Sequence, residues 1–314
     1  MKPIVILGIF NADTSYRAER LPKIGETILG QHFALGPGGK GSNQAVAAAK
    51  AGGRTHFITR LGADDFAKVA RQTWEQAGVI PEVTEDADSH TGAAFIFLEA
   101  ATGNNAIIVA SGAGGRIAPS DLDANARLIG SAAVFVTQLE QPIPAARRGL
   151  EIARAAGVTT ILNPAPAAAL DDAMLALCDF ITPNETEAET LTGLPVTTIA
   201  EAEQAADALM AWGVGAVIVT LGSKGCFISE RSGHAFIPAH RGMRVVDTTG
   251  AGDAFCGGFA AGLVSRKGDI VAAARLGTAV AALSITKPGA APAMPTRAEL
   301  DRFLHITRPL RSQG

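Results

Sequence analysis

The sequence predicts an α/β fold with a doubly wound, mostly parallel sheet and a small β-strand lid, as one domain over residues 1–314. Short runs rich in β-branched residues alternate with longer alanine-rich segments along the whole chain. This alternation is typical of βαβ units whose helices cover both faces of a parallel sheet. No linker divides the sequence, and 314 residues are enough to bury one substantial core.

The strands of the main sheet are predicted from short apolar runs that fit a sheet buried on both faces. The first run follows a single lysine and could be mistaken for a signal peptide. The apolar run ends at Asn11 and is therefore too short for a signal peptide, and no small-residue cleavage site follows it. It is predicted to be a buried first strand instead. The predicted strands are residues 4–9, 55–59, 133–137, 159–162, 180–182 and 216–220.

The helices are predicted from the longer alanine-rich segments between these strands. Several of them follow Ser, Asp or Thr, residues that cap the N-terminus of a helix. The predicted helices are residues 43–51, 64–77, 145–156, 185–191, 199–212, 252–265, 270–284 and 296–304.

Two segments break the alternation and are predicted to form the lid. Residues 13–35 are polar and irregular, with Pro22 and Gly25, whereas residues 92–110 hold two strand-like runs, 93–98 and 106–110. The turn signal Gly103-Asn104-Asn105 lies between these runs, and their patterns favour antiparallel strands outside the main sheet. Such a lid would lie over the carboxyl ends of the strands, where α/β proteins bind ligands, and would exclude water.

The bulk properties exclude several classes of function. A formal charge of −3 and a pI near 6.1 give no electrostatic surface for nucleic acid, and no apolar stretch approaches the ~20 residues that a membrane span requires. The six histidines show no zinc-ligand spacing. Cys178, Cys226 and Cys256 are far apart in apolar or glycine-rich settings, which favours buried reduced thiols in a cytoplasmic protein.

The most informative run is Asp247-Thr248-Thr249-Gly250-Ala251-Gly252-Asp253-Ala254-Phe255. Gly250 and Gly252 allow successive amides to converge on one anion, and the helix that follows adds its positive dipole end. Asp253 then stands where negative charge would develop, as a base that accepts a proton from an attacking hydroxyl would. Taken alone, the run could equally be a turn before a helix.

A second glycine-rich run, Gly36-Pro37-Gly38-Gly39-Lys40-Gly41-Ser42-Asn43-Gln44, precedes another alanine-rich helix. It matches the loose pattern G-x-G-x-x-G, but it does not follow the first strand, as the dinucleotide fingerprint does. It is not a P-loop either, because Lys40 is followed by Gly41 rather than by Ser or Thr.

Together the two runs resemble the two signature motifs of the ribokinase family of carbohydrate and nucleoside kinases. The resemblance extends along nearly the whole chain, through Asn11-Ala12-Asp13, Gln138-Leu139-Glu140, Asn163-Pro164-Ala165-Pro166, Thr182-Pro183-Asn184-Glu185-Thr186-Glu187 and Thr220-Leu221-Gly222-Ser223-Lys224-Gly225. It implies the ribokinase-like fold and the ATP-dependent phosphorylation of the terminal hydroxyl of a pentose, D-ribose to D-ribose 5-phosphate.

The resemblance also implies a role for each matching residue. Asp253 would be the general base, with Gly250, Ala251 and Gly252 as the anion hole. Carboxylates and carboxamides suit paired sugar hydroxyls. The implied sugar-binding residues are Asn11, Asp13, Gly39, Lys40, Gly41, Ser42, Asn43, Glu140 and Asp253.

The nucleotide and the ions are assigned by the same resemblance. Asn184 and Glu187 would help to organise Mg²⁺ and the phosphates of ATP, although Glu187, like Glu185, could simply favour a helix N-terminus. A K⁺ ion behind the anion hole would be bound by oxygen ligands. The implied ATP-binding residues are Asn184, Glu187, Thr220, Leu221, Gly222, Ser223, Lys224, Gly225, Gly252 and Thr278, and the implied K⁺ site comprises Asp247, Thr249, Ser284, Lys287, Gly289 and Ala293.

Several alternatives stay open. Deoxyribose, fructose or adenosine could be the acceptor, since Ile9, Phe10, Tyr16 and Arg17 depart from the family pattern near the sugar site. A non-catalytic sugar or nucleotide sensor could have the same fold. A nicotinamide-dependent oxidoreductase is disfavoured by the missing fingerprint after the first strand. The resemblance further implies a homodimer formed through the lid.

Overall fold

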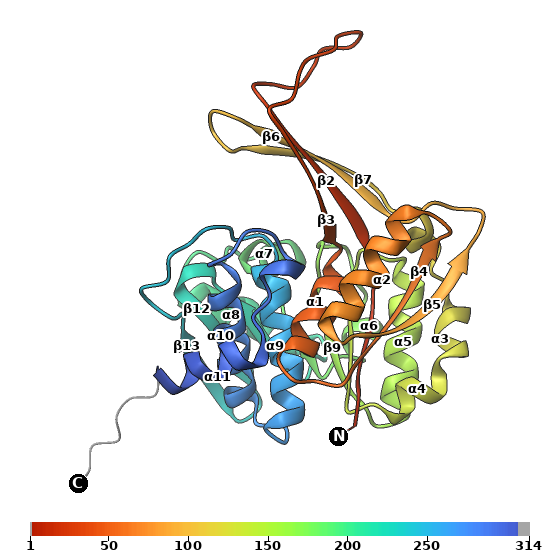
Figure 1. Cartoon of the computed structure of the whole chain (residues 1–314). Helices are drawn as coiled ribbons and strands as arrows, with labels where there is room; N and C mark the ends of the chain where they lie inside the picture. Colours follow the sequence, from red (N-terminus) through yellow and green to blue (C-terminus); the bar gives the residue numbers. More distant parts are fainter. Residues whose placement is uncertain (1, 307–314) are drawn as a thin grey trace.

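The computed structural model describes residues 2–306, in which nine strands form the main sheet in the order β13-β12-β11-β10-β9-β8-β1-β4-β5 (Figure 1). The seven strands from β11 to β5 pair in parallel, and β12 and β13 add an antiparallel hairpin at one edge. The mostly parallel α/β fold is therefore confirmed. The strands are β1 (Ile4–Leu7), β4 (Thr55–Gly62), β5 (Ile80–Asp86), β8 (Val134–Thr137), β9 (Thr159–Leu162), β10 (Phe180–Ile181), β11 (Ala216–Thr220), β12 (Gly225–Glu230) and β13 (Gly233–Pro238).

Helices cover both faces of this sheet and define two hydrophobic cores. Successive residues of β1 point to opposite faces, so Ile4 and Ile6 belong to one core and Val5 and Leu7 to the other. The first core is covered by α1 (Lys40–Lys50), α2 (Asp65–Ala77), α9 (Ala251–Ser265), α10 (Ile270–Ser284) and α11 (Arg297–Ile306). The second is covered by α3 (Pro119–Ala124), α4 (Ala126–Ser131), α5 (Ile143–Ala155), α6 (Asp172–Leu175), α7 (Glu185–Thr192) and α8 (Ile199–Ala211).

A separate four-stranded sheet projects from the body of the molecule (Figure 1). Its order is β3-β2-β6-β7, with β2 (Asn11–Ala18), β3 (His32–Gly38), β6 (Ala93–Glu99) and β7 (Asn105–Ala110); we call it the lid. The pair β6–β7 is antiparallel as predicted; β2–β3 is also antiparallel, whereas the central pair β2–β6 is parallel. The two ends of the segment 13–35, expected to be irregular, belong to β2 and β3, because backbone pairing with a neighbouring strand stabilises even polar residues as a sheet.

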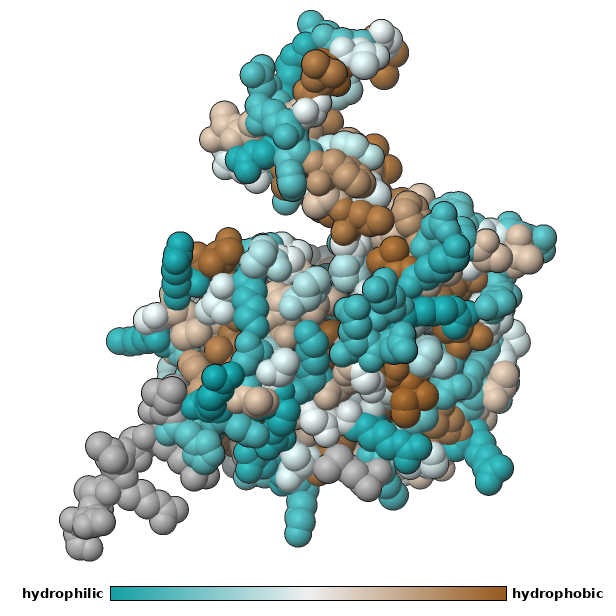
Figure 2. Space-filling view, viewed as in Figure 1, coloured by the Kyte–Doolittle hydropathy of each residue, from teal (hydrophilic) through white to brown (hydrophobic). Residues whose placement is uncertain are grey.

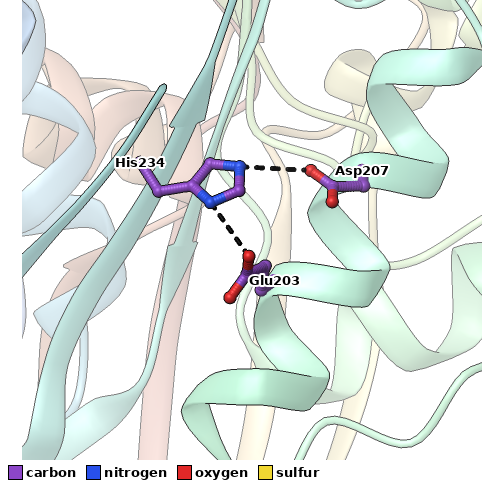
Figure 3. A group of neighbouring side chains, drawn as sticks. All are labelled: Glu203, Asp207 and His234. Carbon is purple, nitrogen blue, oxygen red and sulfur yellow. Dashed lines mark ion pairs between the residues drawn. The ribbon is translucent and has the colours of Figure 1, made fainter. Parts of the chain in front are cut away.

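The edge hairpin is fixed to α8 by a histidine between two carboxylates (Figure 3). His234 of β13 places Nδ1 3.0 Å from Glu203 Oε1 and Nε2 3.5 Å from Asp207 Oδ1. Ser229 of β12 also donates to Asp207, at 3.1 Å. Each ring nitrogen faces a different carboxylate, so these groups pair with one another instead of converging on one point.

No helix among residues 2–306 combines the length and the apolar character needed to cross a bilayer.

Candidate active site

The two glycine-rich runs meet at Asp253, in the first turn of α9. Its carboxylate accepts hydrogen bonds from Asn43 Nδ2 at 3.0 Å and from Gln44 Nε2 at 3.2 Å, both from the first turns of α1. Asp253 is 7% exposed, so these amide donors compensate a buried acid. The central spatial expectation from the sequence, that the two runs fold against each other, is confirmed.

Glycines allow this close approach of segments that are distant in sequence. A Cβ atom added to Gly257 of α9 would lie 2.4 Å from the carbonyl oxygen of Gln44 and 2.6 Å from Ala47 Cβ. A Cβ atom on Gly41 would lie 2.7 Å from the Cα atom of Gly8, at the end of β1. Backbone contacts of this kind require the missing side chains, so these positions set the distance of α1 from α9 and from the sheet.

The start of α9 has the geometry of an anion-binding turn. Gly250 caps the helix with φ +74°, in the left-handed region that favours glycine. A Cβ atom on Gly252 would meet no atom within 4 Å, so the first turn of α9 faces open space. Unpaired amides and the positive end of the dipole are presented there. A phosphate-sized anion therefore fits against Gly250, Ala251 and Gly252.

A pocket of about 170 Å³ lies in front of this turn. It joins the two glycine-rich runs to the ends of β9, β10 and β11, as expected for a ligand site at the carboxyl ends of parallel strands. Eight of its residues belong to the predicted site: Lys40, Asn184, Glu187, Thr220, Gly250, Ala251, Gly252 and Asp253. Sequence reasoning assigned no role to the other five, Asn163, Ala165, Thr182, Thr248 and Cys256.

Five residues that are expected to bind the sugar lie together beside this pocket, at the root of the lid. We call them the sugar cluster: Asn11, Asp13, Lys40, Asn43 and Glu140. Glu140 Oε2 accepts the backbone N–H of Lys40 at 2.7 Å, and Asp13 lies close enough to Glu140 to influence its charge. Asn11 Oδ1 and Asn43 Oδ1 are buried and have no hydrogen-bond partner among the described residues. A buried acceptor without a donor is costly, so the cluster is suited to a ligand that supplies several hydroxyl donors.

Burial governs the charges of these carboxylates. It raises the pKa of Asp13 to about 6. It also raises the pKa of Glu140 to about 7, against the opposing effect of Lys40. The pKa of Asp253 is raised by burial too, while the charge of Lys40 and the amides of Asn43 and Gln44 act to lower it. A buried carboxylate with a raised pKa and a nearby cation suits proton transfer near neutral pH.

The structure places the side chain of Ser42, and the space around Gly41, away from this cluster. Ser42 is fully buried, and its hydroxyl accepts Trp74 Nε1–H at 2.9 Å. Gly41 packs on the backbone of Gly8. Successive helical residues are rotated by about 100°, so when Asn43 and Gln44 face Asp253, Ser42 faces the core. The expected contact of the Ser42 side chain with a sugar is therefore corrected, whereas Gly41, which has no side chain, could contribute only its backbone.

The structure shows one of the two roles that the sequence left as alternatives for Asn184 and Glu187, the capping of a helix. Glu187 Oε2 accepts the N–H of Asn184 at 2.9 Å, while Asn184 Oδ1 accepts the N–H of Glu187 at 2.8 Å. This reciprocal capping box starts α7. Both side chains nevertheless line the pocket, and burial raises the pKa of Glu187. Oxygen ligands of this type fit Mg²⁺ bound largely through water and nucleotide oxygens.

The expected nucleotide loop extends from the pocket toward the molecular surface. Thr220, at the end of β11, lines the pocket, while Leu221 is buried and Lys224 Nζ donates to the carbonyl of Thr197 at 2.6 Å. Gly222, Ser223 and Gly225 complete the turn into β12. Thr278 of α10 donates its hydroxyl to the carbonyl of Arg275 at 3.0 Å and does not line the pocket.

Three of the expected K⁺ ligands, Asp247, Thr249 and Gly289, are joined by hydrogen bonds. Asp247 Oδ1 accepts from Thr249 N at 2.9 Å and Thr249 Oγ1 at 2.6 Å, and its Oδ2 accepts from Gly289 N at 2.8 Å. Partial burial acts to raise the pKa of Asp247, but these hydrogen bonds outweigh burial and lower the pKa. Ser284 ends α10, Lys287 follows it, and Ala293 lies in a short 3₁₀ turn, Ala291–Ala293. The Lys287 ammonium pairs with Glu299, 2.6 Å away, which leaves the carbonyl as its contribution here.

The bulky residues that depart from the family pattern mostly pack elsewhere. Ile9 and Phe10 are each 1% exposed and belong to the two opposite cores. Phe10 makes an edge-to-face contact with Trp74, with ring centroids 5.8 Å apart. Tyr16 packs against Phe33 and Phe95 on the lid, with its ring tilted relative to both. The sugar cluster is therefore not filled by Ile9 or Phe10.

Fold and site define an α/β kinase in which a buried aspartate lines a pocket at the carboxyl ends of the parallel strands. Residues 1–297 match the model of the pfkB family of carbohydrate kinases, and the chain belongs to this family. It is 40% identical over 304 residues to a ribokinase of Haemophilus influenzae, covering 96% of this chain and 98% of the relative. It is 36% identical to a deoxyribokinase of Salmonella typhi, covering 96% and 99%.

Solved structures agree with the sequence relatives. The structure of Arabidopsis thaliana ribokinase complexed with ribose and ATP aligns with a TM-score of 0.91 at 32% identity, covering 96% of this chain and 98% of that one. A ribokinase of Thermotoga maritima aligns with a TM-score of 0.86 at 31% identity, covering 97% and 100%. The ribokinase-like fold is thus confirmed.

Proposed function

We propose that this protein transfers the γ-phosphoryl group of ATP to the terminal hydroxyl of D-ribose and forms D-ribose 5-phosphate. The observation that carries the proposal is the position of Asp253. It lies between a cluster of hydroxyl-binding groups and the anion-binding turn of α9. The identity to ribokinases and the likeness to a structure containing ribose and ATP support the same reaction.

The chemistry follows from this placement. Asn11, Asp13 and Glu140 orient the sugar, and Asp253 accepts the proton of its terminal hydroxyl as the oxygen attacks the γ-phosphorus. The amides at the start of α9 stabilise the charge that builds on the transferred group. Phosphoryl transfer needs chiefly positioning and charge stabilisation, which a fixed base and preorganised donors supply.

Ions complete the proposed site. Mg²⁺ bound to the nucleotide would be organised by Asn184 and Glu187 and would neutralise phosphate charge. K⁺ would be held by the Asp247 carboxylate and the carbonyls of Thr249, Ser284, Lys287, Gly289 and Ala293. The support for K⁺ is the contact of Asp247 with Gly289, which brings the two ligand segments together.

The number of acceptors favours ribose over 2-deoxyribose. The proposed sugar-binding residues include two amide oxygens without a partner among the described residues and two carboxylates. A buried polar site rejects an analogue that lacks a hydroxyl, because one of its groups stays unpaired. The identity to a deoxyribokinase makes deoxyribose the second candidate.

A substrate panel tests the proposal. ADP release is measured with ATP, Mg²⁺ and K⁺ and with ribose, 2-deoxyribose, fructose or adenosine. We expect the highest kcat/KM for ribose. A higher value for another acceptor would replace ribose with that substrate, and ribose binding without ADP release would favour a sensor. A rise in the melting temperature on addition of NADH would instead support the oxidoreductase alternative.

We also propose a cytoplasmic homodimer that pairs through the lid. The three cysteines are buried and unpaired, as is usual for reduced compartments. Hydrophobic side chains are exposed on the projecting sheet (Figure 2), among them Phe33 at 53% and Ile108 at 69%. Apolar patches of this kind mark interaction sites. Light scattering that gives the mass of a monomer at micromolar concentration would refute the dimer.

A further inference from the structure

Gln44 is a fully buried residue of α1 for which the proposed reaction has no stated use. Its amide nitrogen lies 3.2 Å from Asp253 Oδ1 and 3.0 Å from Asn163 Oδ1. Its amide oxygen accepts Gln138 Nε2–H at 2.7 Å. Gln44 therefore connects the buried acid to two side chains that follow β8 and β9.

The donors and acceptors of this hydrogen-bond network can be assigned in only one way. Asn163 Nδ2 donates to the carbonyl of Thr182 at 2.9 Å, so its Oδ1 must face Gln44 as an acceptor. The ionised Asp253 carboxylate is also only an acceptor. Gln44 must then use both amide hydrogens, one for each, and Gln138 supplies the donor for its oxygen. A carboxamide of this length satisfies all three contacts at once.

We propose that Gln44 is a positioning residue for Asp253: it holds Oδ1, fixes the plane of the carboxylate, and thereby presents Oδ2 to the hydroxyl that loses its proton. This inference rests on the proposed function. Asn43 bonds to Oδ2, on the side of the sugar cluster. Gln44 bonds to Oδ1 and is itself held by Gln138 and Asn163.

The same bond affects the charge of the base. Burial raises the pKa of Asp253, and the donor on Gln44 is one of the groups that lower it. The other ionisable groups that influence Asp253 are Lys40 of α1, Glu140 after β8, Glu187 of α7 and Cys256 of α9. Lys40 is the cation among them. Removal of the Gln44 donor leaves them in place and favours protonated Asp253.

The test uses two substitutions. Gln44→Met keeps the length of the side chain and removes its donors, and Gln44→Glu keeps the shape and places an acceptor against Asp253. Gln141→Met is the matched control, because Gln141 is equally buried nearby but donates to Thr137 Oγ1 at 2.8 Å and not to Asp253. Thermal unfolding establishes that each variant is folded at the assay temperature.

We expect Gln44→Met to lower kcat about 10- to 100-fold while KM for ribose changes less than about threefold. The acidic limb of the kcat–pH profile should move to higher pH, further in Gln44→Glu than in Gln44→Met. Gln141→Met should leave that limb in place. An unshifted limb in folded Gln44→Glu, or a change seen only in KM, would overturn the inference.

A second readout separates this inference from the proposed function. The carboxyl carbon of Asp253 is followed by NMR in the sugar-free protein and is assigned by its loss in Asp253→Asn. Its titration midpoint should rise in Gln44→Met even where no phosphoryl transfer is measured. Wild-type protein that phosphorylates no sugar would refute the function alone, and an unchanged midpoint would refute the role of Gln44.

Discussion

Asn43 donates from Nδ2 to Asp253 Oδ2 across 3.0 Å, although 210 positions separate the two residues in sequence. The bond joins the first turn of α1 to the first turn of α9. Each helix starts at a glycine with positive φ, Gly39 at +88° and Gly250 at +74°. Two sharp turns thus direct the Asn43 amide and the Asp253 carboxylate at one another.

The first prediction concerns this acid. Asp253→Asn should lower kcat by about 10²–10⁴, the usual contribution of a positioned general base. Ribose affinity should stay within a few-fold, because the carboxamide keeps the shape of the side chain. Steady-state kinetics and calorimetric titration with ribose measure the two effects. Retention of the wild-type kcat would remove Asp253 from the role of base.

The second prediction concerns Glu140 and follows from its raised pKa. Burial raises this pKa from 4.5 to about 7 in the folded protein. Between these values the folded state keeps a proton that the unfolded state has lost, so stability falls as the pH rises through this range. Glutamine cannot ionise. Glu140→Gln should therefore be roughly 1–2 kcal/mol more stable than wild type at about pH 8 and equal to it at about pH 4.

Urea unfolding of the sugar-free protein at the two pH values measures this difference. The side-chain carbonyl of the introduced glutamine can still accept the N–H of Lys40, so the local backbone contact made by Glu140 is kept. The same variant should bind ribose more weakly, because it lacks a charged acceptor. A stability difference that is the same at both pH values would contradict the raised pKa.

The third prediction compares two glycines of the anion-binding turn. Gly250→Ala forces a side chain into the left-handed region and places its Cβ 2.7 Å from Ala290 Cβ, so it should lower stability by roughly 1–3 kcal/mol. Gly252→Ala meets no atom within 4 Å and should leave stability unchanged or higher. Its methyl group occupies the space in front of α9, so it should raise KM for ATP or lower kcat.

Chemical unfolding and ATP kinetics on both variants test this contrast. Wild-type kinetics in Gly252→Ala would show that the phosphate does not approach this turn.

The fourth prediction compares neighbouring glycines further along α9. Gly257→Ala would push against the Gln44 carbonyl, 2.4 Å away, and displace α1 together with Asn43. Gly258→Ala would push instead against Val280 and Gly277 of α10, at 2.8 and 3.0 Å. Both should destabilise the fold. At a temperature where both are folded, only Gly257→Ala should lose kcat by roughly tenfold or more, an estimate for a small misplacement of the base.

Equal kcat values for these two variants would show that the spacing of α1 and α9 does not control Asp253.

The fifth prediction concerns the monovalent cation. Replacement of tetramethylammonium chloride by KCl at equal ionic strength should raise kcat/KM several-fold in the wild type, because an ion at Asp247 would orient the amides of the anion-binding turn. Asp247→Asn should respond less, since it lacks the charge. Identical kcat/KM in both salts would exclude the K⁺ site.

Much of the fold and the centre of the site could be predicted from local signals. Gly250, Gly252 and Asp253 form a turn and a helix start whatever surrounds them. The parallel strands could be predicted from the sequence because burial on both faces makes each of them a nearly continuous apolar run. The edge strands β5 and β13 were missed because they carry mixed polar and apolar residues. Strand β12 was missed as well; it starts at Gly225, the last residue of the expected nucleotide loop. The short helices α3, α4 and α6 lack a full period of apolar residues.

The rest of the site depends on which face each helix presents. Gln44 follows the predicted ligand Asn43 directly, yet only the packing of α1 on α9 shows that both reach Asp253 while Ser42 turns toward Trp74. Asn163 lies after another strand, and its partnership with Gln44 follows from tertiary structure alone. A single sequence contains no signal for such contacts.

The lid joins the body at a small number of points around Asn11. There β2 begins opposite the end of β3, with Asn11 paired to Gly38, and a Cβ atom on Gly92 just before β6 would lie 2.3 Å from Asn11 Oδ1. A ligand held by Asn11 and Asp13 therefore restrains the roots of three lid strands at once. Amide hydrogen exchange in the lid should slow on ligand binding, which makes exchange rates far from the reacting atoms a direct measure of occupancy.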